Sequence, residues 1–572
     1  MSEKGIIYRA AVFGGAEGIV PDTSEKEKLI GAAITTEGKK TTVTGGTVVC
    51  EEGNLNAFIL RDGAWRIRDT SVQLSGEIGN DLEGLGAGML IEGETDAVLE
   101  NVDIAMEGAS RTTVLVRGNA HLLAKDSRFT TRDGALAEDY VGTVFPAKMK
   151  SSPWMLGVNG NARGTNLMGH AQATYFQSRI RAEKWGALST DDNTGVFLWV
   201  INSDVEVYGG AKERAEVEAL AESGSFDFYH AALEHEFPAG EWQDDRRPSG
   251  YGAYSIGPTL VTIAGSAMLV PDYIAIVANG PSSLHLTSSE PAAIAAAWGY
   301  RDIADALVPR ASRLYSRRFG VMFHSCDGTG TVTVDRGTKL YTGKAAFLVK
   351  GCPGILNVDR AEIATGDGTI LQVMDNDDAG VDTQTLETVK DYVEKHVPGT
   401  ATEERTNAPA VPRDSAFLAT FANMTLKGNI YNASGWEAPR EADILAGMDA
   451  YDNEVGGGAS AATDLKLVLH SVDYTGTVST AEAFHQKQVI GHLDYPMIGD
   501  VRNEVRLPEN AGISVALRAG TVWKVTGRGY ITSLTVDGSS RLEGAKVFVN
   551  GVETAVESGR TYTGVVRVEP LN

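Results

Sequence analysis

Short apolar segments recur along the chain, and most of them begin or end with glycine. They read GMLIEG from Gly88, TVLVRG from Thr113, GALSTD from Gly186, GAYSIG from Gly252, GVMFHS from Gly320, AFLVKG from Ala346 and GTILQV from Gly368. Where the steps are simple, successive segments lie 22 to 26 residues apart, which is typical of repeat proteins. Runs that alternate apolar and polar residues lie between them, with Gly, Asn or Asp at their ends. This pattern predicts an all-β chain of short strands, three to a coil, that stack into a right-handed parallel β-helix.

The repeat resembles the right-handed parallel β-helix superfamily that contains pectate lyases and polygalacturonases, over about residues 41–535. Residues 520–551 resemble the closing coils and cap of bacterial β-helix passenger domains, in which a Trp and a Tyr close the last coil. The resemblance implies a fold, whereas members of the superfamily are lyases, hydrolases, isomerases and adhesins, so the fold does not select a function. A series of β-sandwiches is the alternative, and it would not give a constant register.

Three longer steps in the repeat contain residues of a different character. They are rich in Ala, Glu, Leu and Lys, with apolar residues three or four positions apart, which predicts helices. These insertions lie near 211–245, 291–318 and 382–397. All three are predicted to enter at one corner of the coil and to form a lateral wall or lid, with edge protection or an oligomer contact as the alternative. The predicted domains are an N-terminal cap at 1–40, the β-helix at 41–510, and closing coils with a C-terminal cap at 511–572.

Alternation along each strand assigns side chains to two faces. One column of the aligned segments is almost entirely polar, and burying its charges unpaired would cost several kcal/mol each, so we expect it to face outward. The outward strip then holds Tyr254, Met322, His324, Lys350 and Gln372, with Thr190 and Asp192 on the preceding coils. Asp191 is expected to point the other way, and a turn role for both aspartates is the alternative.

Acid–base chemistry is the chemistry most easily built from this strip. His324 is assigned as base or acid because its ordinary pKa lies near neutrality, with Tyr254 as its partner and Asp192 orienting or stabilising. The substrate-binding candidates are Lys350, Tyr251, Trp185, Asp272, Tyr273, Thr190 and Gln372. We therefore expect a cofactor-independent lyase or isomerase that acts on a hydroxylated small molecule, sugar-like or phenolic. A surface His, packed tyrosines and a solvated Lys are the non-catalytic alternatives.

Two other functions stay open. Asp191-Asp192 followed by Gly250-Tyr251-Gly252 resembles the Asp-Asp and Gly-His-Gly segments of polygalacturonases, with Tyr251 in place of the His, so a glycoside hydrolase is one alternative. A non-catalytic β-helix scaffold or adhesin is the other, and it predicts a polar strip without a lidded pocket.

Composition narrows the partners. A formal net charge of −24 repels nucleic acid and anionic membranes, so neither is expected as a partner. Three cysteines imply no disulfide framework, and neither zinc spacing nor a nucleotide-binding motif is present, so no metal or cofactor is expected. The acidic loop from Asp375 to Asp378 leaves calcium binding open. No apolar run is long enough for a signal peptide or a membrane span, which predicts a cytoplasmic protein whose partner is a small molecule, with a homo-oligomer compatible with the insertions.

Overall fold

The computed structural model describes residues 9–15, 18–21, 29–53, 55–76, 84–109, 111–132, 134, 163–183, 186–191, 195–207, 250–270, 274–298, 301–316, 318–324, 328–375, 377, 416–435, 463–486 and 499–571. The chain forms two compact units. The first comprises Met1–Phe228, Phe237–Ala275 and Ser289–Arg310, and the second comprises Tyr229–Glu236, Ile276–Ser288 and Ala311–Asn572. Each unit is all-β and mostly parallel, which confirms the predicted fold class at this level.

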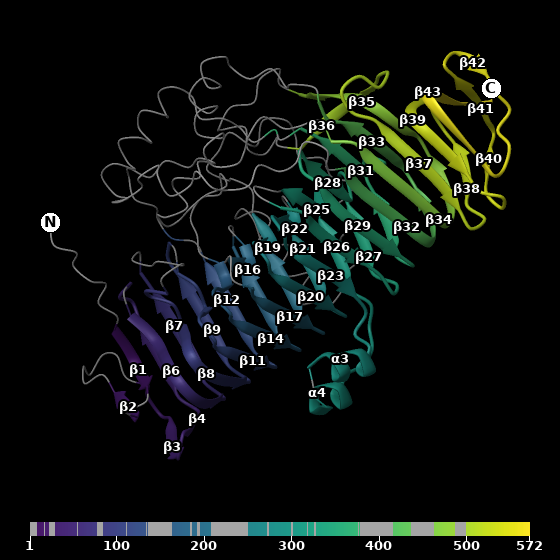
Figure 1. Cartoon of the computed structure of the whole chain (residues 1–572). Helices are drawn as coiled ribbons and strands as arrows, with labels where there is room; N and C mark the ends of the chain where they lie inside the picture. Colours follow the sequence, from purple (N-terminus) through teal and green to yellow (C-terminus); the bar gives the residue numbers. More distant parts are fainter. Residues whose placement is uncertain are drawn as a thin grey trace, which may run out of the picture. The chain divides into compact units, whose positions relative to one another are not determined.

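The described strands of the first unit form three parallel stacks (Figure 1). The first stack contains β1 (Arg9–Gly15), the first halves of β6 (Leu55–Arg68) and β8 (Met89–Glu100), β10 (Val114–Val116), β13 (Arg163–Leu167), β16 (Gly186–Asp191) and β19 (Tyr251–Ile256). The second contains β4 (Lys40–Thr44), the second halves of β6 and β8, β11 (His121–Lys125), β14 (Gln172–Phe176), β17 (Phe197–Ile201) and β20 (Leu260–Ala264). The third contains β5 (Thr47–Cys50), β7 (Ser71–Ser75), β9 (Asp103–Glu107), β12 (Arg128–Arg132), β15 (Arg179–Ala182), β18 (Asp204–Val207) and β21 (Ala267–Val270). Consecutive strands such as β10, β11 and β12 enter different stacks, an arrangement compatible with a β-helix-like fold.

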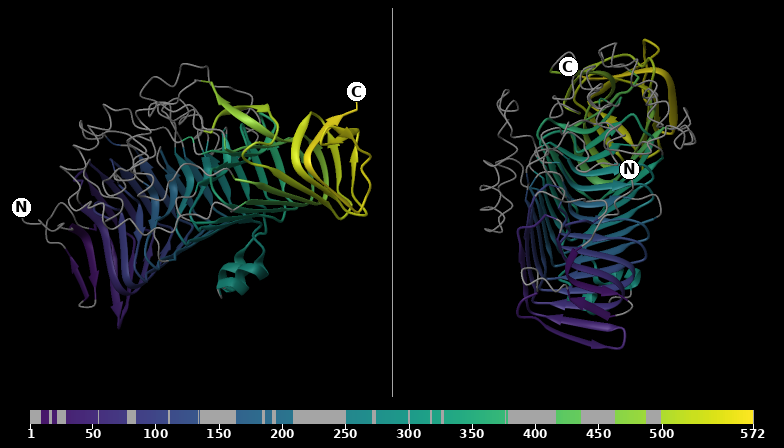
Figure 2. Two further views of the ribbon diagram at one scale, coloured as in Figure 1. Left: turned by 45° about the horizontal axis from the view of Figure 1, so that its top comes forward. Right: turned by 90° about the vertical axis from the view of Figure 1, so that its left-hand side faces the viewer.

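The second unit repeats this arrangement in its own strands, whose layering is visible in the left-hand view of Figure 2. Its first stack contains β25 (Phe319–His324), β28 (Phe347–Lys350), β31 (Thr369–Met374), β33 (Asn429–Ala433) and β35 (Val478–His485). Its second contains β23 (Ser283–Thr287), β26 (Gly330–Val334), β29 (Gly354–Asp359), β32 (Phe417–Lys427), β34 (Leu465–Gly476) and β37 (Ile513–Arg518). Its third contains β24 (Arg313–Ser316), β27 (Lys339–Thr342) and β30 (Glu362–Thr365).

Antiparallel strand pairs occur near each terminus of the chain. Near the amino terminus, β2 (Gly18–Pro21) pairs with β1 and β3 (Ala33–Glu37) with β4. Near the carboxy terminus, β39 (Gly529–Val536) pairs with β43 (Arg560–Pro570), which also pairs with β41 (Ala545–Val549). Trp523 on β38 (Val522–Val525) is buried beside Tyr474 and donates its indole N–H to the Gly476 carbonyl at 3.0 Å. Antiparallel pairing covers strand edges that would otherwise offer free hydrogen-bonding groups.

Helices are few among the described residues. Of the predicted helical insertions, only 291–318 is described, and it contains two short helices, α3 (Pro291–Trp298) and α4 (Arg301–Ala306), followed by strand β24. The insertions near 211–245 and 382–397 lie outside the described residues. No helix in the described part has the length and apolar character needed to cross a membrane.

The expectation of one common corner for the insertions was wrong. In chain order, 208–249 follows the third-stack strand β18, α3 and α4 follow the second-stack strand β23, and 378–415 follows the first-stack strand β31. The error arose because the insertions were located by their distance from the repeated glycines. These glycines do not occupy equivalent positions in the strand register, as Gly186 pairs with Tyr251 and not with Gly252. A helical wall along one side is therefore not supported.

Aromatic contacts identify the inner faces of the stacks. In the second unit the rings of Phe323 and Phe417 lie 4.8 Å apart, and those of Phe347 and Phe421 lie 6.2 Å apart, although the partners belong to different stacks. These side chains therefore point inward, and residues next to them in the strands, such as Met322 and Leu348, point outward.

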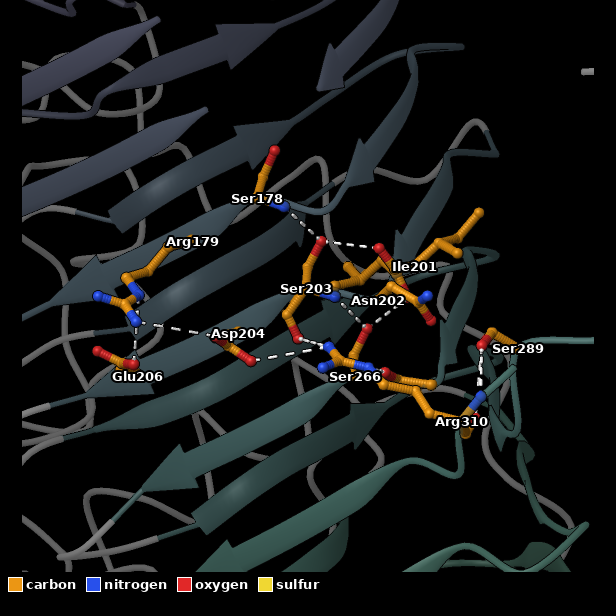
Figure 3. Close-up of polar contacts among 12 residues, drawn as sticks. Ser178, Arg179, Ile201, Asn202, Ser203, Asp204, Glu206, Ser266, Ser289 and Arg310 are labelled. Carbon is orange, nitrogen blue, oxygen red and sulfur yellow. Dashed lines mark hydrogen bonds and ion pairs between the residues drawn. The ribbon is translucent and has the colours of Figure 1, made fainter. Parts of the chain in front are cut away.

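A two-residue corner follows each second-stack strand of the first unit from β6 onward. Its first residue has a left-handed backbone, as in Asp126 (φ 51°), Gln177 (φ 48°) and Asn202 (φ 47°). Its second residue is usually a serine that connects successive coils: Ser203 accepts the Ser178 N–H at 3.0 Å and donates its hydroxyl to the Ile201 carbonyl at 2.9 Å (Figure 3). The remaining bonds of this serine ladder run from Val102 N–H to Ser127, from Ser127 N–H to Ser178 and from Ser203 N–H to Ser266. The ladder satisfies backbone N–H groups that the turn would leave buried and unpaired.

Arg310 attaches the segment that contains α3 and α4 to this corner (Figure 3). Its guanidinium donates to the Gly265 carbonyl and, at 3.3 Å, to the Ser203 carbonyl. Ile294, Ile303 and Leu307 pack on apolar side chains at the ends of β14, β17 and β20. The helices are therefore fixed to the first unit by both apolar and polar contacts.

We predict that Ser203→Ala destabilises the first unit by about 1–3 kcal/mol, because the buried Ser178 N–H loses its acceptor. The urea-unfolding midpoint measured by circular dichroism checks this. Ser71→Ala, at a half-exposed serine outside the ladder, is the control and should change the midpoint little. Equal effects of the two substitutions would contradict a structural role for the ladder.

Candidate functional site

The outward face of the first stack in the second unit carries three of the predicted site residues. His324 pairs in register with Lys350, and Met322 pairs with Leu348, which in turn pairs with Gln372. The sequence alignment had placed Gln372 beside Lys350, so it was two residues out of register there but correct about the face. His324 is half-buried at the end of β25.

Lys350 faces outward and yet is completely buried, because an ion pair covers it. Its Nζ lies 2.9 Å from Asp377 Oδ1, and the exposed fractions of the two side chains are 0% and 2%. The other carboxylate oxygen, Oδ2, lies 2.8 Å from His485 Nε2 and accepts the Gly499 N–H at 2.6 Å. One buried cluster therefore brings together Lys350 from β28, Asp377 from just beyond β31, and His485 and Gly499 from a distant hairpin. We call it the Lys350–Asp377–His485 cluster.

Opposing effects act on the Asp377 carboxyl. Burial alone would raise its pKa, but the Lys350 ammonium, His485 and the Gly499 N–H together hold the pKa below its usual value. The carboxylate is therefore the stable form beside Lys350. Because Nε2 of His485 lies against Oδ2, Nδ1 is the ring nitrogen that does not take part in this contact.

The cover over this face is an arm made of β35 and β36 (Val501–Val505), which pair antiparallel. Asn503 on β36 exchanges two hydrogen bonds with the buried Gln372 side chain, at 2.7 and 3.1 Å. Gly499 has φ 76°, and a Cβ there would lie 2.6 Å from Leu348 Cδ2, so only glycine fits so close to the strip. The arm therefore covers part of the strip on which the sequence placed the candidate site.

Charged side chains hold the start of β36. Asp500 contacts the Arg318 guanidinium at 3.4 Å and the Lys344 ammonium at 3.2 Å. Arg318 is almost fully buried and lies over the Phe319 ring at 5.5 Å. Together with the Gln372–Asn503 pair, these contacts fix the arm at several points along the first stack.

The first unit holds the tyrosines that were assigned to the site. Tyr254 pairs with Ser189, is 4% exposed and packs against the buried Tyr251, with 5.1 Å between ring centroids. Thr190 pairs with Leu167 and Ser255 and is buried. Since Ser189 shares the face of Tyr254, Thr190 points to the opposite face, and its assignment to the outward strip was wrong.

Asp191 shares the face of Ser189 and Tyr254, so its assignment to the inner side was wrong, and it makes an ion pair with the buried Arg163. Its neighbour Asp192 lies outside the described residues, as do Trp185, Asp272 and Tyr273. Their roles stay predictions, as does the proximity of Tyr254 to His324, which belong to different units.

The predicted acidic loop is only partly described. Asp375 accepts the Gly435 N–H at 2.8 Å and Asp377 belongs to the buried cluster, whereas Asp378 lies outside the described residues. Within the described ranges, no group of three or more His, Cys, Asp or Glu side chains could hold a metal ion.

Sequence reasoning missed His485, Gly499 and Asn503 as parts of this site. They contact residues that lie more than 100 positions earlier in the chain. The only signal for these residues in the sequence is local. Apolar and polar residues alternate in 478–485, which ends at His485, and a second strand-like segment follows Gly499. That pattern predicts strands but does not identify what they cover.

No protein-family model matches the chain, and no curated protein matches it.

We predict that Asn503→Leu destabilises the second unit by about 1–3 kcal/mol, because the buried Gln372 amide loses both hydrogen bonds to Asn503 and keeps its bond to the Val373 carbonyl at 3.3 Å. Gln372→Met combined with Asn503→Leu should recover much of that loss, since no polar group is then left unpaired. Urea unfolding of the single and double variants gives the coupling energy. Strictly additive effects would show that the two amides do not stabilise each other.

Proposed function

We propose that the chain is a right-handed parallel β-helix of the pectate lyase and polygalacturonase-like type. We further propose that its second unit carries a cofactor-independent acid–base site that acts on a hydroxylated small molecule, sugar-like or phenolic. The observation that carries this proposal is the presence of two histidines, His324 and His485, beside one buried Lys–Asp pair. The three parallel stacks within each unit support the fold part of the proposal.

In this proposal His485 is the base. Asp377 Oδ2 accepts the Nε2 proton, so that Nδ1 can accept a proton from the substrate. His324 is the acid in this proposal. It is half-buried, and its strand neighbours the strand of Lys350 at a spacing of about 4.8 Å, so it lies near the cluster and can still be reached by a substrate. Lys350 and Asp377 have almost no exposed surface, so they position His485 rather than contact the substrate.

One imidazole on the outward face and one on the arm that covers it favour removal of a proton from carbon and its return. Elimination results when a leaving group departs from the neighbouring carbon, and isomerisation results when the proton returns elsewhere, which is why lyase and isomerase remain one proposal. His485 takes the partner role first given to Tyr254, whose ring is packed against Tyr251.

Hydrolysis is favoured less by the same contacts. An inverting or retaining glycosidase needs two available carboxyl groups, one of them protonated. Asp377 is buried in an ion pair and Asp375 accepts a backbone N–H, so neither is offered to a glycosidic bond in the described site.

Solvent exchange tests the proposal without knowledge of the reaction direction. We predict that the protein in D₂O replaces a carbon-bound proton of at least one of galacturonate, a galacturonate oligomer, fructose and a hydroxycinnamic acid, as followed by proton NMR. His324→Ala and His485→Ala should each slow this exchange by about 10²-fold or more. Circular dichroism would verify that both variants remain folded.

His121→Ala is the matched control. His121 also contacts an aspartate, Asp96, at 3.1 Å, but it is exposed and belongs to the first unit, so the exchange rate should not change. Exchange that persists in both His324→Ala and His485→Ala would show that other residues carry out the proton transfer. No exchange with any of the four compounds would reject the acid–base proposal for these substrates and favour the scaffold.

A further inference from the structure

The contact between Lys350 and Asp377 differs from an ordinary ion pair in its burial. Other lysine ion pairs within the described residues are partly exposed, such as Lys344 with Asp500, at 30% and 24%. In the Lys350–Asp377 pair both side chains are closed off from solvent. Two charges buried away from solvent carry a desolvation cost in free energy, and a reaction that neutralises both of them removes that cost.

The approach of the two groups is also unusual. Nζ lies 2.9 Å from Oδ1, yet Oδ1 accepts no hydrogen bond of acceptable direction from any described residue. The amine thus lies beside the carboxyl group, in contact with Oδ1 but without a hydrogen bond to it. Oδ2 meanwhile receives two donors, the Gly499 N–H at 2.6 Å and His485 Nε2 at 2.8 Å. Two donors on one oxygen form the arrangement that stabilises an oxyanion.

We propose that Lys350 and Asp377 condense into an intramolecular isopeptide bond, a covalent amide between Nζ and Cγ that cross-links β28 to the segment after β31. This modification goes beyond the proposed function and does not depend on it. The reactants are both on the chain, and the only other product is water.

The step balances without an added reagent. One ammonium proton passes from Nζ to Oδ1, which gives a neutral amine and a neutral acid. Nζ then forms a bond to Cγ, and the charge that develops on Oδ2 is stabilised by Gly499 and His485. A second proton passes from nitrogen to Oδ1, the Cγ–Oδ1 bond breaks, and Oδ1 departs as water. Oδ2 remains as the amide carbonyl, and the third proton remains on nitrogen.

Burial supports each part of this sequence. Burial by itself acts against both charged forms, the ammonium and the carboxylate, and so offsets part of the stabilisation that the carboxylate receives from its neighbours. Loss of water to bulk solvent removes two buried charges and leaves a neutral amide. The arm closes the site, since Gly499 and His485 both belong to it or adjoin it.

Intact-mass spectrometry of the full-length, denatured protein tests the proposal. The wild-type chain should be lighter than its sequence by one water molecule, and proteolysis should release a branched peptide that contains Lys350 and Asp377. Lys350→Met should have the full mass of its sequence. Lys344→Met, which removes a partly exposed lysine from an ion pair in the same unit, should still lack one water.

His485→Ala provides a second readout. Loss of one oxyanion donor should slow bond formation by about 10²-fold, so that freshly purified protein contains the unlinked form. A wild-type mass equal to that of the sequence would overturn the proposal. So would a water loss that persists in Lys350→Met, or one located by peptide mapping at any other residue; the wild-type branched peptide keeps the test decisive if a variant fails to fold.

Discussion

Parallel, in-register pairing of each strand with its counterpart one coil earlier is the constraint on which the rest of each unit depends. Because equivalent residues lie about 4.8 Å apart, every side chain must be compatible with the one stacked on it. Inward positions therefore repeat apolar groups, and the corner repeats hydroxyl groups that bond backbone N–H groups. Outward positions may carry charge if neighbours compensate it, as Arg181 and Glu206 do at 2.6 Å. The buried Lys350 obeys the same rule through a partner supplied from outside the stack.

The faces of individual strands could be predicted from sequence because alternation is a local property. His324, Lys350 and Gln372 were assigned to one outward face, and the registers agree. Thr190 was assigned wrongly for an identifiable reason: the strand at 163–167, RGTNL, has too little apolar character to be recognised, and Gly186 was aligned with Gly252. In the structure Gly186 pairs with Arg163 and Tyr251, so a slip of one residue exchanged the two faces.

The contacts that build the candidate site could not be predicted in the same way. Asp377 and His485 are separated by 108 residues, and Gln372 and Asn503 by 131, and no periodicity relates the members of either pair. They meet because the arm folds back across strands that are already fixed by stacking. The repeat thus supplies a regular surface, whereas the chemistry comes from a segment that departs from the repeat.

The two-residue corner keeps the same length and hydrogen bonding in successive coils of the first unit, and so fixes how these coils stack in register. Successive ladder bonds join residues 25, 51, 25 and 63 positions apart, so coil length varies more than twofold while the corner keeps its two residues and its backbone. Length changes in these coils are thus confined to the other two turns. A residue inserted between Asn202 and Ser203 would interrupt the row of ladder hydrogen bonds, whereas dozens of residues separate β18 from β19 along the chain. Comparisons of this chain with other stacked-strand proteins are therefore best aligned on the left-handed residue and the hydroxyl after it, which mark the coils more reliably than the glycines do.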